Sequence, residues 1–491
     1  MDDIKDKSIH HTAIKICEDF KSSPSYQALF RDLQKLVSTP SVKYDDFKDS
    51  LLKAMKDNGL DAGLRNNVYH WMKTKKKEIA CPHDTFFRKS QIHWDKRIHK
   101  SLNSMCTELG INLAKVRTVS EKEELANKWG ELSNYEVDIH KYRPVYAPKD
   151  FLEVLLNLKG PTTRNKGSPK WEFAQMPLKV KNLADLRCLY LELSRGEQIL
   201  GINSSMLSST HYSALEAERM ILGEKVLTKN YAPIAQEFLK KGCPQCLRAK
   251  IWTLILGAEV KPYHYSYFES LKESVLQYDL MIDKLIIKDI NLTASNDDQY
   301  FVFEDVLYQV LLCFSRDGDV LKDLSTQPGF MQVVIKGKQS NTENTIIFPP
   351  SGVIPFHGFT MYAAPFCYLY DDPVQLYFVF RTFYYEKMLQ CFEPSLWHHF
   401  RKCQIHPVRV VIKWIMRAFS GHLPPEQLLN LWDLILAYDS LEIIPLLALV
   451  ILVFRKDNLL KVNTLQNIEA VLADLSSISV IPLLQMSLLK D

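Results

Sequence analysis

The spacing of apolar residues is the feature that most limits how this chain can fold. In "SPSYQALFRDLQKLV" at 23–37 and "YDDFKDSLLKAMKDNG" at 44–59, apolar side chains recur every three or four positions, as on the buried face of an α-helix. Ser23-Pro24 and Asn58-Gly59 are typical signals for the start and the end of a helix. No stretch before residue 155 alternates convincingly with the period of a strand. The pattern therefore predicts an all-α fold.

Two irregular segments interrupt this pattern. The first, "GPTTRNKGSPK" at 160–170, is interpreted as a loop or linker, and the second, at 325–352, fits either a small hairpin or a long loop. Because 491 residues exceed one ordinary core, we expect two main parts. The expected division is an N-terminal helical domain (1–159), a linker with connecting helices (160–234), an all-helical domain (235–440) and C-terminal helices packing on it (441–491).

Charge and hydropathy argue against several classes of protein. The net charge of +4 is too small to predict binding to nucleic acid. The longest apolar run, 443–454, is too short to span a bilayer, and no secretory signal opens the chain. Ten unpatterned cysteines are typical of a reducing compartment. We therefore expect a cytoplasmic protein without a transmembrane segment.

Intrinsic cofactor or metal chemistry has little support in the sequence. No phosphate-binding loop, dinucleotide fingerprint, serine nucleophile elbow or metal-type histidine spacing is present, so we expect neither a cofactor nor a metal. Cys243 and Cys246 form a Cys-x-x-Cys pair, but a structural zinc site needs four ligands and no second pair exists. The preceding stretch has a helical pattern, which does not fit a thioredoxin-like motif.

A basic stripe lies on the helix predicted from 407 onward. Arg409, Lys413 and Arg417 recur every four residues and therefore share one face of that helix. A solvated face is the simpler interpretation of this stripe. Contact with an acidic partner is the alternative.

The stretch "GCPQCLRAKIWTLILG" at 242–257 resembles the entry motif of the TBC domain, the all-helical module of Rab GTPase-activating proteins. The residues that match this motif are Gly242, Pro244, Leu247, Arg248, Trp252, Leu256 and Gly257. Cys243 stands at an aliphatic position, which indicates a packing role. "VIKWIMRAFSGHLPPEQLLNLWD" resembles a later block of the family through Trp414, Phe419, Leu423, Pro424, Leu431, Trp432 and Asp433. The resemblance covers about 235–455 and implies that 235–440 is a TBC domain.

In the family, an arginine and a glutamine are inserted into the active site of the Rab protein, a small GTPase. The arginine neutralises developing charge on the phosphoryl group, and the glutamine positions the attacking water. In "IIKDINLT", Asp289 and Thr293 match the arginine motif, but Leu292 stands at the arginine position. In "PFHGFTMYAAPF", Gly358 matches the glutamine motif, but His357 stands at the glutamine position. No catalytic residue is therefore assigned, and these five residues are the candidates for Rab contact.

The resemblance implies a regulator of a GTP-bound Rab protein in membrane traffic, rather than an enzyme itself, that is cytoplasmic or peripheral at intracellular membranes. Three alternatives stay open: a GTPase-activating protein, an inactive Rab-binding scaffold, and a helical adaptor independent of Rab. An N-terminal protein partner is a further expectation. Arginines elsewhere in the chain, such as Arg316 or Arg381, are candidates to reach the site in place of the missing one.

Overall fold

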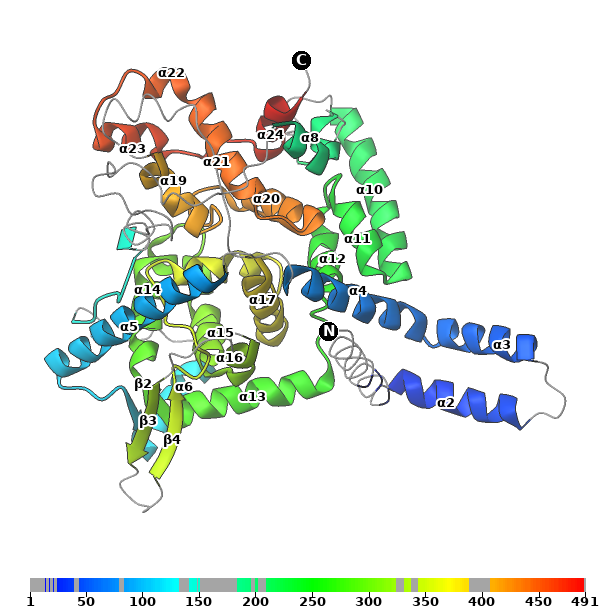
Figure 1. Cartoon of the computed structure of the whole chain (residues 1–491), viewed down its shortest axis with the longest axis horizontal. Helices are drawn as coiled ribbons and strands as arrows, with labels where there is room; N and C mark the ends of the chain where they lie inside the picture. Colours follow the sequence, from blue (N-terminus) through cyan, green and yellow to red (C-terminus); the bar gives the residue numbers. More distant parts are fainter. Residues whose placement is uncertain are drawn as a thin grey trace.

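The computed structural model describes most of the chain. The described residues are 14, 17, 21, 24–38, 44–78, 84–131, 141–147, 149–150, 183–195, 199–201, 209–323, 331–336, 343–387 and 407–489. They form packed helices with two short antiparallel strand pairs (Figure 1). The all-α prediction is confirmed. The linker predicted at 160–170 lies outside the described residues.

The N-terminal part of the chain is helical. Its helices are α2 (Pro24–Val37), α3 (Tyr44–Asp57), α4 (Leu60–Glu78), α5 (Asp84–Leu109) and α6 (Val119–Glu131). Helices α2, α3 and α4 form its arm. α2 and α3 project from the body of the molecule in Figure 1, and α4 leads back to it. As predicted, α2 begins at Pro24, and α3 ends before Gly59, whose φ is +71°.

The remaining helices form the body. In chain order they are α8 (Leu183–Leu189), α9 (Leu191–Ser194), α10 (Ser209–Lys229), α11 (Ala232–Leu239), α12 (Gln245–Leu256), α13 (Pro262–Gln277), α14 (Met281–Leu292), η1 (Ala294–Asn296), η2 (Phe301–Phe303), α15 (Glu304–Arg316), α16 (Gly318–Asp323), η3 (Phe359–Tyr362), η4 (Ala364–Tyr368), α17 (Pro373–Lys387), α19 (Pro407–Met416), α20 (Pro425–Tyr438), α21 (Ile443–Phe454), α22 (Lys456–Leu459), α23 (Leu465–Ala473) and α24 (Val480–Leu488). The last of these, α24, packs on α20 and α21. Among the described helices, none is long and apolar enough to cross a membrane.

Short strands occur in two places. β3 (Met331–Lys336) pairs antiparallel with β4 (Glu343–Phe348), so the hairpin interpretation of 325–352 is confirmed. β1 (Ala114–Val116) pairs with β2 (Tyr278–Leu280) and was not predicted from the sequence. With three residues each, these two strands are too short to show an alternating pattern.

The β1–β2 pair joins the N-terminal part to the body. Next to it, Arg117 lies 3.2 Å from Asp279 and 3.3 Å from Asp283, and Arg316 contacts Asp283 at 2.7 Å. A hydrophobic cluster around these pairs takes residues from both parts of the chain: Ile98, Leu102, Met105, Cys106, Ala114, Tyr142, Leu280, Met281, Ile282, Leu285, Phe348 and Ile354. The N-terminal part and the start of α14 therefore share a core.

Candidate functional site

Asp289, on the last turns of α14, organises the candidate site. Its buried carboxylate accepts hydrogen bonds from the backbone N–H of Gly358 at 2.6 Å and of Thr360 at 2.8 Å. The Thr360 hydroxyl donates to the same carboxylate at 2.6 Å. Such charge-assisted bonds are the stronger kind of hydrogen bond in proteins. Asp289 thus ties the end of α14 to the turn that carries the glutamine position.

The other arginine-motif residues lie where α14 ends. The Thr293 hydroxyl is buried and donates to the carbonyl oxygen of Asp289 at 2.5 Å, which satisfies a carbonyl of the last helical turn. Leu292 leaves 44% of its surface exposed. An isobutyl group at this position presents neither charge nor hydrogen-bond donor to a bound partner.

The turn at 355–360 contacts Asp289 of α14 and Tyr146 of the N-terminal part. The Nδ1 atom of His357 lies 3.5 Å from Oδ1 of Asp289. The backbone N–H of His357 donates to the carbonyl of Tyr146 at 3.1 Å, and the Tyr146 hydroxyl donates to the carbonyl of Ile354 at 3.1 Å. The Tyr146 ring also packs on Phe356, with centroids 5.5 Å apart. Sequence reasoning did not find this clamp, because nothing in the local pattern links residue 146 to residue 357.

We predict that removing the Tyr146 hydroxyl loosens this turn without unfolding the protein. Tyr146→Phe keeps the ring contact but deletes one hydrogen bond, typically worth about 0.5–1.5 kcal/mol. Amide hydrogen exchange at 355–360 is expected to speed up while exchange in α20 stays unchanged. Tyr142→Phe, four residues earlier in the same segment, is the control. Equal protection of the turn in wild type and Tyr146→Phe would contradict the clamp.

The two arginines considered as replacements for the missing one are engaged inside the fold. Arg316 is buried and donates to both carboxylate oxygens of Asp283 at 2.7 Å each. Arg381 pairs with the buried Asp317, with Nε 3.1 Å from Oδ2. Neither guanidinium is available to a partner without breaking an internal ion pair. A different arginine, Arg417, lies against the turn, because a Cβ built on Gly358 would overlap its Nε atom.

The residues that carry the entry motif and the later block form a buried network apart from this turn. Arg248 contacts both carboxylate oxygens of Asp433, and its Nη2 atom lies 2.9 Å from Oδ2 of Asp433 and 3.0 Å from Oδ1 of Asn430. The Trp252 indole N–H donates to Asp433 at 2.7 Å. The Trp252 and Trp432 rings stack at a centroid distance of 6.3 Å. These contacts join α12 to α20 through the core.

The other motif residues pack around this network. Gly242 has φ +85°, and a Cβ there would lie 2.7 Å from the backbone oxygen of Leu200, so a larger residue does not fit. Pro244 precedes α12, Leu247 and Trp414 are buried, and the Cys243 thiol is buried while Cys246 is exposed. Burial raises the pKa of the Cys243 thiol well above its usual value. Among the described residues, no group of three or more His, Cys, Asp or Glu is placed to hold a metal.

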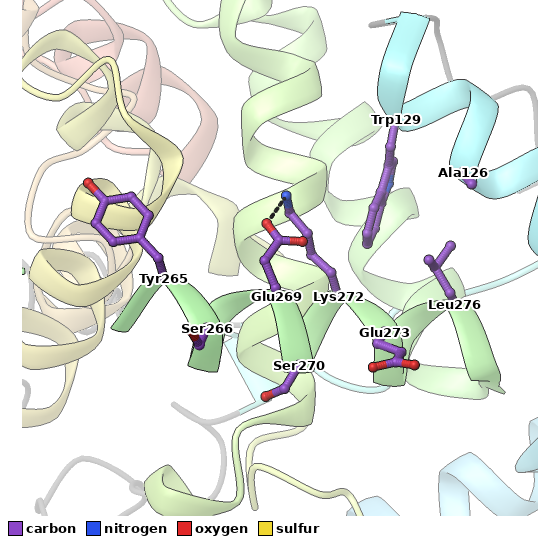
Figure 2. Close-up of a pocket in the computed structure, with 9 residues that line it drawn as sticks. All are labelled: Ala126, Trp129, Tyr265, Ser266, Glu269, Ser270, Lys272, Glu273 and Leu276. Carbon is purple, nitrogen blue, oxygen red and sulfur yellow. Dashed lines mark hydrogen bonds and ion pairs between the residues drawn. The ribbon is translucent and has the colours of Figure 1, made fainter. Parts of the chain in front are cut away.

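A separate surface cavity of about 770 Å³ lies between α6 and α13 (Figure 2). Trp129 forms one wall, and α13 contributes Tyr265, Ser266, Glu269, Ser270, Lys272, Glu273 and Leu276. Lys272 and Glu269 pair there at 2.8 Å. The cavity contains none of the residues predicted for the site.

Part of the chain is similar to known proteins. A family model described as the Rab-GTPase-TBC domain matches residues 358–460, from the Asp289-bound turn through α22. Among solved structures, the crystal structure of the Chlamydomonas flagellar RabGAP TBC domain is similar at 15% identity with a TM-score of 0.40, over 56% of this chain and 92% of that one.

A relative extends the similarity to nearly the full length. TBC1 domain family member 19 of Homo sapiens is 42% identical over 512 residues, which cover 96% of this chain and 97% of that protein. The chain therefore belongs to the TBC-domain family. The similarity includes the N-terminal part.

Proposed function

We propose that this protein regulates a Rab-family GTPase by binding its GTP-bound form at the surface made by the end of α14 and the turn at 357–360. The observation that carries the proposal is the bonding of Asp289 to Gly358 and Thr360, which ties the helix end that carries position 292 to the turn that carries position 357. Thr293 closes the end of the helix at the same place. The protein would act in the cytoplasm on a Rab held at an intracellular membrane.

Weak acceleration of GTP hydrolysis is part of this proposal. An arginine finger contributes about 10³–10⁵ in rate, or roughly 4–7 kcal/mol of barrier, and leucine supplies none of this electrostatic stabilisation. Leu292 instead offers apolar contact area. η1 connects α14 to η2, where Phe301 and Val302 are also exposed. An exposed leucine at the arginine position favours binding over catalysis, and this supports the scaffold as a second candidate.

The N-terminal arm supports a further protein partner. Its helices α2, α3 and α4 leave large apolar side chains exposed at Phe30, Leu52, Leu64, Val68 and Met72. We include a partner for this arm in the proposal as a function separate from Rab binding.

The test is a screen of GTP-loaded Rab proteins that measures binding and single-turnover hydrolysis with the full-length protein. We expect one or a few Rabs to bind in the GTP form, with weak acceleration, and Asp289→Ala to abolish the binding. Asp319→Ala, at an acidic residue in α16, is the control. Binding without any acceleration favours the scaffold. Neither binding nor acceleration with any Rab would favour the adaptor and overturn the proposal.

A further inference from the structure

Arg417 lies in a turn whose backbone is fixed by the residues of the later family block. The two residues after it, Ala418 and Phe419, have φ values of +45° and +65°. Residues other than glycine seldom adopt this left-handed conformation. The indole N–H of Trp432 donates to the Ala418 carbonyl at 3.1 Å, and the Phe419 N–H donates to the Trp414 carbonyl at 2.7 Å. Strained backbone of this kind persists only where its surroundings hold it, and it is frequent at functional sites.

This turn places the Arg417 guanidinium against the glutamine-position turn. A Cβ built on Gly358 would overlap Nε of Arg417 and lie 2.8 Å from Nη2 and 2.9 Å from Cζ. The guanidinium therefore packs on the α-carbon of Gly358, on a residue whose N–H is bonded to Asp289. A glycine at 358, with φ +96°, is required both by the backbone and by this contact.

The charge of Arg417 has no partner among the described residues. No ion pair within 4 Å and no side-chain hydrogen bond to another described residue involves its guanidinium, and its Nε atom is buried without an acceptor. The carboxylate of Asp289 is occupied by Gly358 and Thr360. By contrast, the guanidinium groups of Arg248 and Arg316 each contact a buried carboxylate. The Nε atom of Arg316 is also unpaired, but its guanidinium forms an ion pair, whereas the guanidinium of Arg417 has no carboxylate partner among the described residues. Because buried polar groups in proteins are usually paired, Arg417 is a candidate to contact an external partner.

Arg417 lies against the turn that carries position 357, and this location indicates the chemistry of its external partner. In the proposed function, the nucleotide of the bound Rab lies at the surface next to residues 292 and 357. Guanidinium groups match phosphate oxygens in geometry and charge. Arginine remains charged at neutral pH even though burial lowers the pKa of Arg417, with nearby Asp289 opposing this effect.

We infer that Arg417 is the cationic group with which this site contacts the terminal phosphate of the Rab-bound nucleotide, in place of the arginine absent at 292. The inference rests on the proposed function. During hydrolysis the water oxygen bonds to the γ-phosphorus, and the bond from that phosphorus to the β–γ bridging oxygen breaks. GDP leaves with its bridging oxygen, and inorganic phosphate leaves carrying the oxygen and the two protons of the attacking water. Arg417 donates hydrogen bonds to the developing charge and exchanges no proton.

The test compares Arg417→Met with wild type on the Rab selected by the binding screen. Affinity is measured for the Rab in two forms, loaded with a non-hydrolysable GTP analogue and with GDP plus aluminium fluoride, which mimics the transferring phosphoryl group. Removing one such donor typically costs about 10²–10³-fold. We expect the aluminium fluoride complex to weaken at least about tenfold more than the GTP-analogue complex.

Matched variants separate charge from structure. Arg417→Lys keeps the charge without the fork and should give an intermediate loss. Lys413→Met removes an exposed cation of the same stripe and should change neither affinity. Thermal melting checks the fold, and Arg417→Gln provides a second neutral variant if methionine disturbs the turn.

The outcomes are distinguishable. Equal weakening of both complexes, or none, in folded neutral variants would overturn the role of Arg417 while leaving Rab binding intact. If the wild-type protein binds no Rab at all, the proposed function fails first, and this inference fails with it.

Discussion

Leu292→Arg combined with His357→Gln is expected to raise the single-turnover rate of GTP hydrolysis on the Rab partner. Leu292 is exposed at the end of α14, so an arginine fits there without disturbing the core. Asp289 and Thr293 already fix the end of the helix from which it would project. The introduced arginine would supply the charge, and the introduced glutamine would orient the water. The arginine should contribute more to the rate than the glutamine.

The size of the gain depends on how well the new side chains are placed. A well-placed arginine finger is worth about 10³–10⁵ in rate, and a misplacement of about 1 Å costs on the order of 10²-fold. The hydrogen bonds with Tyr146 hold the glutamine turn in its position in this protein. We therefore expect a gain of at least about tenfold but incomplete recovery. Leu292→Met, a neutral substitution of similar size, is the control and should have little effect.

Arg417 modifies this expectation. If its guanidinium already contacts the phosphate, Leu292→Arg should gain more in an Arg417→Met background than in the wild type. Strong activation by the unmodified protein, unaffected by Leu292→Ala and His357→Ala, would show that the catalytic groups lie elsewhere.

Local sequence patterns predicted what depends on neighbouring residues. The helix limits at Pro24 and Asn58 follow from capping preferences, whereas the segment 325–352 fitted either a hairpin or a long loop until the structure showed β3 paired with β4. The motif residues Arg248 and Asp433 lie 185 positions apart. Arg248 belongs to the entry motif and Asp433 to the later block of the family resemblance, but only the structure shows that they form an ion pair.

The contacts that sequence could not predict are those made between distant segments. The Tyr146 carbonyl accepts the hydrogen bond from the His357 N–H because the N-terminal part folds onto the body, and this contact does not follow from a local pattern. Arg417 was assigned to a basic stripe for which a solvated face was the simpler interpretation. Lys413 follows that interpretation, with 62% of its side chain exposed, but Arg417 packs on Gly358. The left-handed turn after α19 redirects the chain there, and helical spacing contains no sign of it.

The second large effect concerns stability. Arg248→Met is expected to destabilise the protein by about 3–5 kcal/mol at neutral pH, because it leaves the Asp433 carboxylate buried without a countercharge. Asp433 retains 2% of its surface exposed and would keep the Trp252 indole as donor. Arg65→Met removes the surface pair of Arg65 with Asp61, at 3.1 Å, and should cost less than about 1 kcal/mol. Urea unfolding midpoints measure both variants.

The loss in Arg248→Met should depend on pH in a defined direction. Burial raises the pKa of Asp433, while Arg248 and Trp252 lower it. Without Arg248 the pKa in the folded state rises further, whereas the unfolded chain has a value near about 3.9. Between these two values the folded state holds a proton that the unfolded state has released, so stability falls as pH rises. The penalty should therefore be small below about pH 4 and grow toward neutrality. A loss that is constant from about pH 4 to about pH 8 would show that packing, rather than the uncompensated carboxylate, is what Arg248 provides.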